Sequence, residues 1–198
     1  HPSRAWDVEL KTFAADNSMM STRKRELKRR YDLTAYMYDR RYREIQREKY
    51  EAVLANVTRV DRILDLGCGT GMLLSPLGRR ARLTVGVDMS AEMLRTAKKR
   101  ATGTPLLLAD ADHLPFADGS FDMVVSVTLL QNMPDPGKTV RELARVLRSG
   151  GKVIITSLKH KHSPEQLAAW AAAANLQPLK VGEISGSEDV ICVARRTL

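Results

Sequence analysis

The sequence predicts an α/β fold in which an open, doubly wound sheet carries a helical cap before its first strand. From residue 60 onward, short apolar strands alternate with amphipathic helices. A glycine-rich turn follows the first strand, and two short strands near the end form a hairpin. The length of 198 residues suits one such domain, and its 43% hydrophobic residues, with aromatic residues at only 5%, predict a mostly aliphatic core.

Runs of aliphatic residues bounded by turn residues indicate the strands. They are expected over residues 62–66, 83–87, 106–109, 121–127 and 152–157, followed by a hairpin of 179–184 and 190–194. The run 121–127 is largely apolar, which is typical of a strand buried on both faces of a parallel sheet.

Apolar residues at helical spacing indicate the helices between these strands. Helices are expected over residues 21–55, 72–80, 91–100, 137–147 and 164–174. Ser90 is placed to cap the helix 91–100, because a serine hydroxyl accepts a backbone N–H in the first turn. Ser149, Gly150 and Gly151 are expected to end the helix before the fifth strand.

Composition and patterning divide the chain into three parts and exclude several classes. We expect a poorly patterned extension over 1–19, a basic helical cap over 20–58 and a catalytic domain over 59–198. No apolar run is long enough to span a membrane, and no secretory signal is expected. Two cysteines, Cys68 and Cys192, exclude a disulfide framework or a four-cysteine zinc module, so we expect no metal and a cytoplasmic location.

The cap concentrates positive charge. Residues 20–50 contain eleven Lys or Arg and five Asp or Glu, a net +6 out of +9 for the whole chain. Such a patch favours a polyanion such as RNA, and the alternative is a solvated helix stabilised by ion pairs one turn apart. An apolar and aromatic stripe, Tyr31, Ala35, Tyr38, Tyr42 and Ile45, either packs on the main domain or closes over a ligand.

The glycine-rich turn runs from Asp65 to Gly71 and has the spacing G-x-G-x-G. Met72 stands where the dinucleotide fingerprint requires its last glycine. A carboxylate at Asp65 would repel a diphosphate and attract a cation. The turn therefore predicts a nucleoside ligand that lacks a diphosphate and carries a positive charge.

Acidic residues also end the next two strands. Asp88 lies 21 residues after Gly67, where a carboxylate accepts both ribose hydroxyls. Asp110 is placed to accept from an adenine amino group, while the N–H of Ala111 donates to the ring. Asp112 and His113 are interpreted as turn residues.

These segments together resemble class I S-adenosylmethionine-dependent methyltransferases, strongly over 60–157 and through the hairpin to 198. The resemblance implies a seven-stranded sheet of order 3-2-1-4-5-7-6 with the last strand antiparallel, and S-adenosylmethionine as cofactor. The cap is similar to that of ubiquinone and menaquinone C-methyltransferases, in which a tyrosine often lies over the cofactor. The implied cofactor residues are Tyr38, Asp65, Gly67, Cys68, Gly69, Asp88, Met89, Asp110, Ala111 and Ser126.

The acceptor site is expected after the fourth strand, with Thr128 and Asn132 as candidate catalytic residues. The Asn/Asp/Ser-Pro-Pro-aromatic motif of exocyclic amine methyltransferases is absent there. Asn132 could polarise an acceptor amine through its carbonyl oxygen, or it could cap a helix before Pro134.

Three functions remain open: methylation of an RNA base nitrogen, methylation of a quinone or other metabolite, and a non-catalytic subunit that activates a partner. The basic residues favour ribosomal or transfer RNA, with a small activator protein as a further possible partner. The expected RNA contacts are Arg23, Lys24, Arg25, Lys28, Arg29 and Arg30 of the cap and Lys159, His160, Lys161 and His162 of the loop 159–162. That loop lacks the further ligands of a zinc site.

Overall fold

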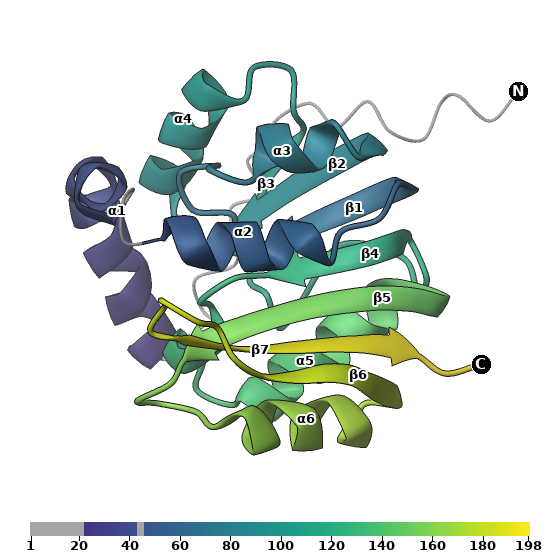
Figure 1. The fold of residues 1–198 in the computed structure, drawn as a ribbon. Helices are drawn as coiled ribbons and strands as arrows, with labels where there is room; N and C mark the ends of the chain where they lie inside the picture. Colours follow the sequence, from purple (N-terminus) through teal and green to yellow (C-terminus); the bar gives the residue numbers. More distant parts are fainter. Residues whose placement is uncertain (1–21, 43–45) are drawn as a thin grey trace, which may run out of the picture.

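A computed structural model describes residues 22–42 and 46–198, without the side chains of 33 and 35–42. These residues form a seven-stranded sheet of order β3-β2-β1-β4-β5-β7-β6 with helices on both faces (Figure 1). The strand order and the antiparallel last strand confirm the expected class I methyltransferase topology. The extension 1–19 lies outside the described residues.

The elements follow the expected alternation closely. The strands are β1 (Val60–Leu66), β2 (Ala81–Asp88), β3 (Leu106–Leu108), β4 (Phe121–Ser126), β5 (Leu147–Leu158), β6 (Leu176–Glu183) and β7 (Asp189–Arg196). The helices are α1 (Thr22–Tyr42), α2 (Arg47–Ala55), α3 (Leu74–Gly78), α4 (Ala91–Arg100), the 3-10 turn η1 (Leu130–Asn132), α5 (Pro136–Val146) and α6 (Pro164–Ala173).

Strand direction determines where the site lies. Strands β1 to β5 pair in parallel, and β7 pairs antiparallel with both β5 and β6. The carboxyl ends of the parallel strands therefore meet at one edge, which is the edge that ligands occupy in doubly wound sheets. Helix α1 stands beside this edge (Figure 1).

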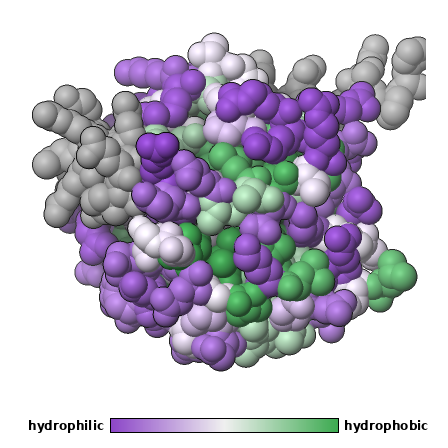
Figure 2. Space-filling model, in the orientation of Figure 1, coloured by the Kyte–Doolittle hydropathy of each residue, from purple (hydrophilic) through white to green (hydrophobic). Residues whose placement is uncertain are grey.

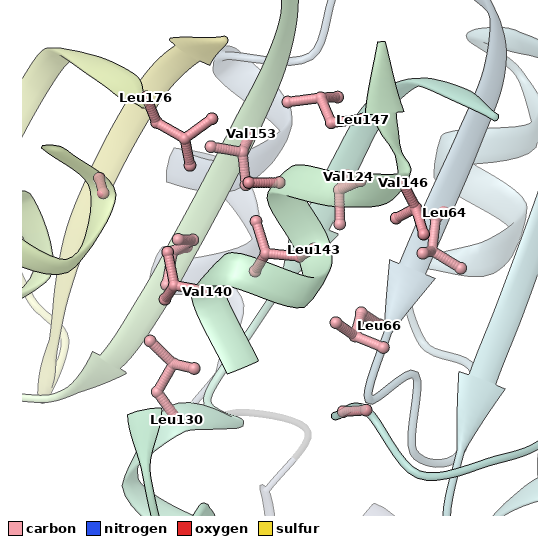
Figure 3. Packing of buried hydrophobic residues seen from close by; sticks show 14 of the residues in the cluster. Leu64, Leu66, Val124, Leu130, Val140, Leu143, Val146, Leu147, Val153 and Leu176 are labelled. Atoms are coloured by element: carbon pink, nitrogen blue, oxygen red, sulfur yellow. The ribbon is translucent and has the colours of Figure 1, made fainter. Parts of the chain in front are cut away.

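Two aliphatic clusters hold the layers together. On one face, α5 packs Val140 and Leu143 against Val124 and Val153 of the sheet, and all four side chains are fully buried (Figure 3). On the other face, Val53 of α2 and Leu77 of α3 join a second buried cluster. Burial of this apolar surface is the main favourable term in folding, and it fixes the strand ends that carry the site.

Two expectations about helix ends are wrong. The segment 21–55 forms two helices, because α2 buries Val53 against the sheet while α1 runs beside the sheet edge and contacts α4. Residues 149–151 do not end a helix, since α5 stops at Val146 and β5 already begins at Leu147. They lie where the β4–β5 register shifts, and a Cβ at Gly151 would lie 2.9 Å from the carbonyl oxygen of Asp122.

The capping box of α6 gives a first test of the fold. The Ser163 hydroxyl accepts from the N–H of Gln166 at 3.2 Å, and the Gln166 side chain accepts from the N–H of Ser163 at 2.8 Å. We expect Ser163→Ala to lower the free energy of unfolding by about 1 kcal/mol. Urea unfolding measures this, with the exposed Ser149→Ala as a control expected to stay within about 0.5 kcal/mol. Equal losses in both variants would contradict the cap.

Figure 2 shows hydrophilic and hydrophobic side chains interspersed on one face of the molecule. Leu179 and Val181 of β6 are large hydrophobic residues that are exposed. None of the described helices is long and apolar enough to cross a membrane.

Candidate functional site

The glycine-rich turn connects β1 to α3 and is held against the end of β2. The backbone N–H groups of Gly67 and Cys68 both donate to the carbonyl oxygen of Val87, at 2.8 and 2.9 Å. Gly67 and Gly69 have φ values of +76° and +55°, which residues with a Cβ rarely adopt. No atom lies within 4 Å of a Cβ built on Gly69, so the turn leaves open space above its backbone.

Asp88 ends β2 and organises this turn. Its carboxylate accepts from the N–H of Gly69 and from the N–H of Ser90, both at 2.9 Å. The hydroxyl of Ser90 in turn accepts from the N–H of Met93 and caps α4, as expected. Burial raises the pKa of Asp88, although the N–H groups of Ser90 and Gly69 oppose the shift. Any further hydrogen-bond donor that reaches Asp88 would therefore stabilise its charged form.

Asp65 lies beside Asp88 on the neighbouring strand and is only 2% exposed. Burial, and then the charge of Asp88, raises the pKa of Asp65 to about 7. Asp88 is partly buried, and a cation or hydroxyl donors would stabilise the charged forms of both carboxylates. S-adenosylmethionine offers both, through its amino and sulfonium groups and its ribose hydroxyls, so the residues present fit this cofactor.

Two cavities flank the turn, and Gly67 lines both. The Asp88 cavity, which is mostly apolar, is lined by Leu27, Tyr31, Leu66, Gly67, Val87, Asp88, Met89, Ala109, Ala111, Leu129, Asn132 and Met133. The Asp65 cavity is lined by Gln46, Tyr50, Asp65, Gly67, Cys68, Gly69, Thr70, Met72, Leu73 and Val127. The structure thus brings most of the expected cofactor residues to one continuous sheet edge.

Helix α1 covers the Asp88 cavity. Leu27 and Tyr31 contribute to its lining, and the Tyr31 hydroxyl contacts the side-chain amide of Asn132. Asp32 accepts from the hydroxyl of Ser90 and from the N–H of Glu92, so it docks the cap on the start of α4. The side chain of Tyr38, the expected cofactor contact in the cap, lies outside the described residues.

Lys24 has a different place from the one expected. Its side chain is buried, and its ammonium group donates at 2.7 Å to both oxygens of Asp110 and to Asp112. The expectation that Lys24 contacts RNA at the surface is therefore wrong, because two buried carboxylates hold its side chain inward. Asp110, expected to accept from adenine, already accepts from Lys24. Asp112, interpreted as a turn residue, also accepts from the hydroxyl of Thr139.

Thr128 belongs to a buried polar cluster and lines neither cavity. Its hydroxyl accepts from Lys49 at 2.7 Å and donates to Asp189 at 2.9 Å, and its φ is +55°. Lys49 also donates to Asp189 at 3.3 Å, and burial lowers the pKa of Lys49. Ser126 is fully buried, and no described group pairs with its hydroxyl.

The loop after β5 is only partly available to a ligand. Lys159, His160 and Lys161 are exposed, and Lys159 lies 3.6 Å from Glu188. His162 turns inward, where its Nδ1 lies 2.8 Å from the hydroxyl of Ser157 and its ring stacks edge-on against Trp170. The expectation that the side chain of His162 is available to contact RNA is therefore wrong. Among the described residues, no His, Cys, Asp and Glu side chains gather in a metal-binding cluster.

Comparison with known proteins supports the methyltransferase resemblance. Residues 64–155 match the family described as Methyltransferase domain. The chain is 35% identical over 159 residues to a malonyl-[acyl-carrier protein] O-methyltransferase of Marinomonas sp. (strain MWYL1), covering 77% of this chain and 58% of that protein. It is 38% identical over 135 residues to a demethylmenaquinone methyltransferase of Streptomyces avermitilis, covering 66% and 56%. The chain thus spans less than two thirds of the length of these relatives.

Solved structures share the fold at low sequence identity. Magnesium protoporphyrin IX methyltransferase from Synechocystis PCC 6803, with bound S-adenosylmethionine, has a TM-score of 0.75 at 20% identity, covering 90% of this chain and 99% of that chain. A methyltransferase in complex with the Haloferax volcanii Trm112 activator has a TM-score of 0.72 at 22% identity, covering 85% and 98%.

Proposed function

We propose that this chain, whose residues 64–155 belong to the methyltransferase-domain family, transfers the methyl group of S-adenosylmethionine to a base nitrogen of ribosomal or transfer RNA. The domain is that of an S-adenosylmethionine-dependent methyltransferase, and the identity of the acceptor is the step that we add. The observation that carries the cofactor part is the pair of carboxylates on either side of the glycine-rich turn, Asp65, which is buried, and Asp88, which is partly buried.

The chain's own groups can bind and orient the cofactor. Asp88 would accept the ribose hydroxyls, and Ala111, with Met89 and Leu129, would enclose the base. Asp65 would pair with the positive charge of the methionine portion, and Gly67, Cys68 and Gly69 would let it approach the backbone. When bound, the cofactor supplies an activated methyl group, and the protein supplies orientation and exclusion of water. Asn132, which lines the Asp88 cavity, would position the acceptor, whereas the Thr128 hydroxyl is already bound to Lys49 and Asp189.

Basic side chains beside the Asp88 cavity favour an RNA acceptor. Arg23, Arg25, Arg29 and Arg30 are exposed on α1, the same helix that lines the cavity through Leu27 and Tyr31. Phosphates bound by these arginines would bring an unpaired or flipped base to the edge of the sheet at which Asp65 and Asp88 would hold the cofactor. A small activator protein could complete recognition. Two buried free thiols agree with a cytoplasmic location.

A small-molecule acceptor is the second candidate. The apolar lining of the Asp88 cavity favours it, as do the names of the two relatives, one a malonyl-[acyl-carrier protein] and the other a demethylmenaquinone methyltransferase. In that case the arginines of α1 would face solvent or an acidic surface and would not affect turnover.

Transfer of a labelled methyl group separates the two. The protein is incubated with methyl-labelled S-adenosylmethionine and, separately, with total RNA, ribosomal subunits and a lipid and metabolite extract, all from cells that lack the enzyme. We expect label in RNA or subunits, and we expect Arg25→Gln/Arg29→Gln to reduce it at least tenfold. The control Lys98→Gln/Lys99→Gln removes the same charge from exposed positions on α4. Label confined to the extract would overturn the RNA proposal and leave the methyltransferase assignment intact.

A further inference from the structure

A second basic surface lies at the opposite edge of the sheet from the cofactor site. There a cavity of about 490 Å³ opens where β1, β2 and β4 begin, on the right of Figure 1. Five of its nine lining residues are arginines: Arg59, Arg79, Arg80, Arg82 and Arg148. We call this surface the arginine groove.

The fold fixes two arginine-bearing segments side by side. Val60 pairs with Ala81 at the start of the β1–β2 ladder, and the N–H of Val60 donates to the carbonyl oxygen of Arg80 at 3.0 Å. Arg59 is therefore held next to the run Arg79–Arg82, and the side chains of these residues line one cavity. Several cations held near one another repel unless an anion joins them.

Two of the five arginines have structural partners. Arg80 donates to the carbonyl oxygen of Pro76 at 3.1 Å, at the end of α3. Arg148 pairs with Asp122, which also accepts from the N–H of Arg62. These contacts give Arg80 and Arg148 a structural role that needs no bound ligand.

The other three have no such explanation. Within the part of the chain that the structure describes, Arg59, Arg79 and Arg82 are exposed and make no ion pair or side-chain hydrogen bond. The acid left to balance them in the groove is Asp61, since Asp122 is already paired. Arginine, with its planar fork of donors, is the side chain best suited to binding phosphate oxygens in pairs.

From this arrangement we infer that the arginine groove is a second anion site, which binds phosphate groups through Arg59, Arg79 and Arg82. The source is either the backbone of a nucleic acid or a small phosphate compound. The inference does not depend on the proposed acceptor, because the groove lies at the opposite edge of the sheet from Asp65 and Asp88.

Binding of two probes without cofactor tests the site. The first is a short fluorescent single-stranded RNA followed by anisotropy, and the second is pyrophosphate followed by calorimetry. The variant Arg79→Gln/Arg82→Gln is compared with Lys98→Gln/Lys99→Gln, which removes the same charge outside the groove. We expect the groove variant to weaken binding of at least one probe about tenfold, and to reduce the salt slope for RNA by about 1 to 2.

The probes also identify the source of the phosphate. If the groove variant binds both probes more weakly, or RNA alone more weakly, the groove is assigned to a nucleic acid backbone. If it binds only pyrophosphate more weakly, the groove is assigned to a small phosphate compound. Equal losses in the groove and control variants, or no loss in either, would overturn the inference. S-adenosylmethionine affinity, measured in the same samples, should be unchanged in both variants, so that failure of the cofactor site would be recognised separately.

Discussion

Asp88→Asn is expected to weaken S-adenosylmethionine binding about 100-fold. The carboxylate would accept two hydroxyls of the ribose while it already orders the turn through Gly69 and Ser90. Hydrogen bonds to a charged group contribute about 1.5 to 3 kcal/mol each, and an asparagine keeps one acceptor oxygen. A loss of about 3 kcal/mol corresponds to about 100-fold in affinity. Calorimetric titration of the cofactor measures this directly.

A matched control separates recognition of the ribose from the general loss of a carboxylate that accepts from the backbone. Asp135 caps α5, accepting from the N–H of Lys138 at 3.1 Å, and it lies outside both cavities. We expect Asp135→Asn to keep the cofactor affinity of the wild type. Thermal melting verifies that both variants fold. A folded Asp88→Asn variant that binds cofactor within about threefold of the wild type would contradict the role of Asp88.

Asp65→Asn is expected to abolish measurable cofactor binding and to stabilise the cofactor-free protein. The pKa of Asp65 is raised to about 7 in the folded chain, above its ordinary value of 3.8. Folding therefore takes up a proton between about pH 4 and 7, and the charged carboxylate costs stability above pH 7. We expect the Asp65→Asn substitution to raise the free energy of unfolding by about 2 kcal/mol at pH 8 and by little at pH 4. Urea unfolding at the two pH values measures this difference.

The same shift predicts the pH dependence of cofactor binding. A cationic ligand favours the charged carboxylate, so the affinity of the wild type should fall as the pH drops below about 7. Titration of S-adenosylmethionine between pH 5 and 8 tests this, and any residual affinity of the Asp65→Asn variant should not vary over that range. Wild-type affinity that is constant with pH would show that Asp65 does not pair with the cofactor.

Local sequence patterns predicted the sheet and the turn because both depend on neighbouring residues. Strand positions follow from aliphatic runs, and the cap of α4 follows from one serine, Ser90, placed before the helix. The turn at Gly67 and Gly69 needs positive φ values, which the glycines themselves signal. Asp65 and Asp88 were expected near one another because parallel strands place their carboxyl ends at the same edge, and the structure places them on the adjacent parallel strands β1 and β2.

The buried ion pairs could not be found in this way. Lys24 meets Asp110 across 86 positions of sequence, and Lys49 meets Asp189 across 140. A lysine in a basic helix has the same local pattern whether it faces solvent or a carboxylate, and only the packing of the cap decides. Arg59, Arg79 and Arg82 of the arginine groove could not be grouped for a related reason, because they come from two separate segments of the chain.

The most direct test of the account is to titrate S-adenosylmethionine, S-adenosylhomocysteine and NAD separately into the wild-type protein by calorimetry. Asp65 beside a turn without the last fingerprint glycine should admit the first two ligands and exclude the diphosphate of NAD. We predict one site per chain for each adenosyl ligand and no heat of binding for NAD. Binding of NAD, or failure of both adenosyl ligands to bind the folded protein, would contradict the assignment of this site.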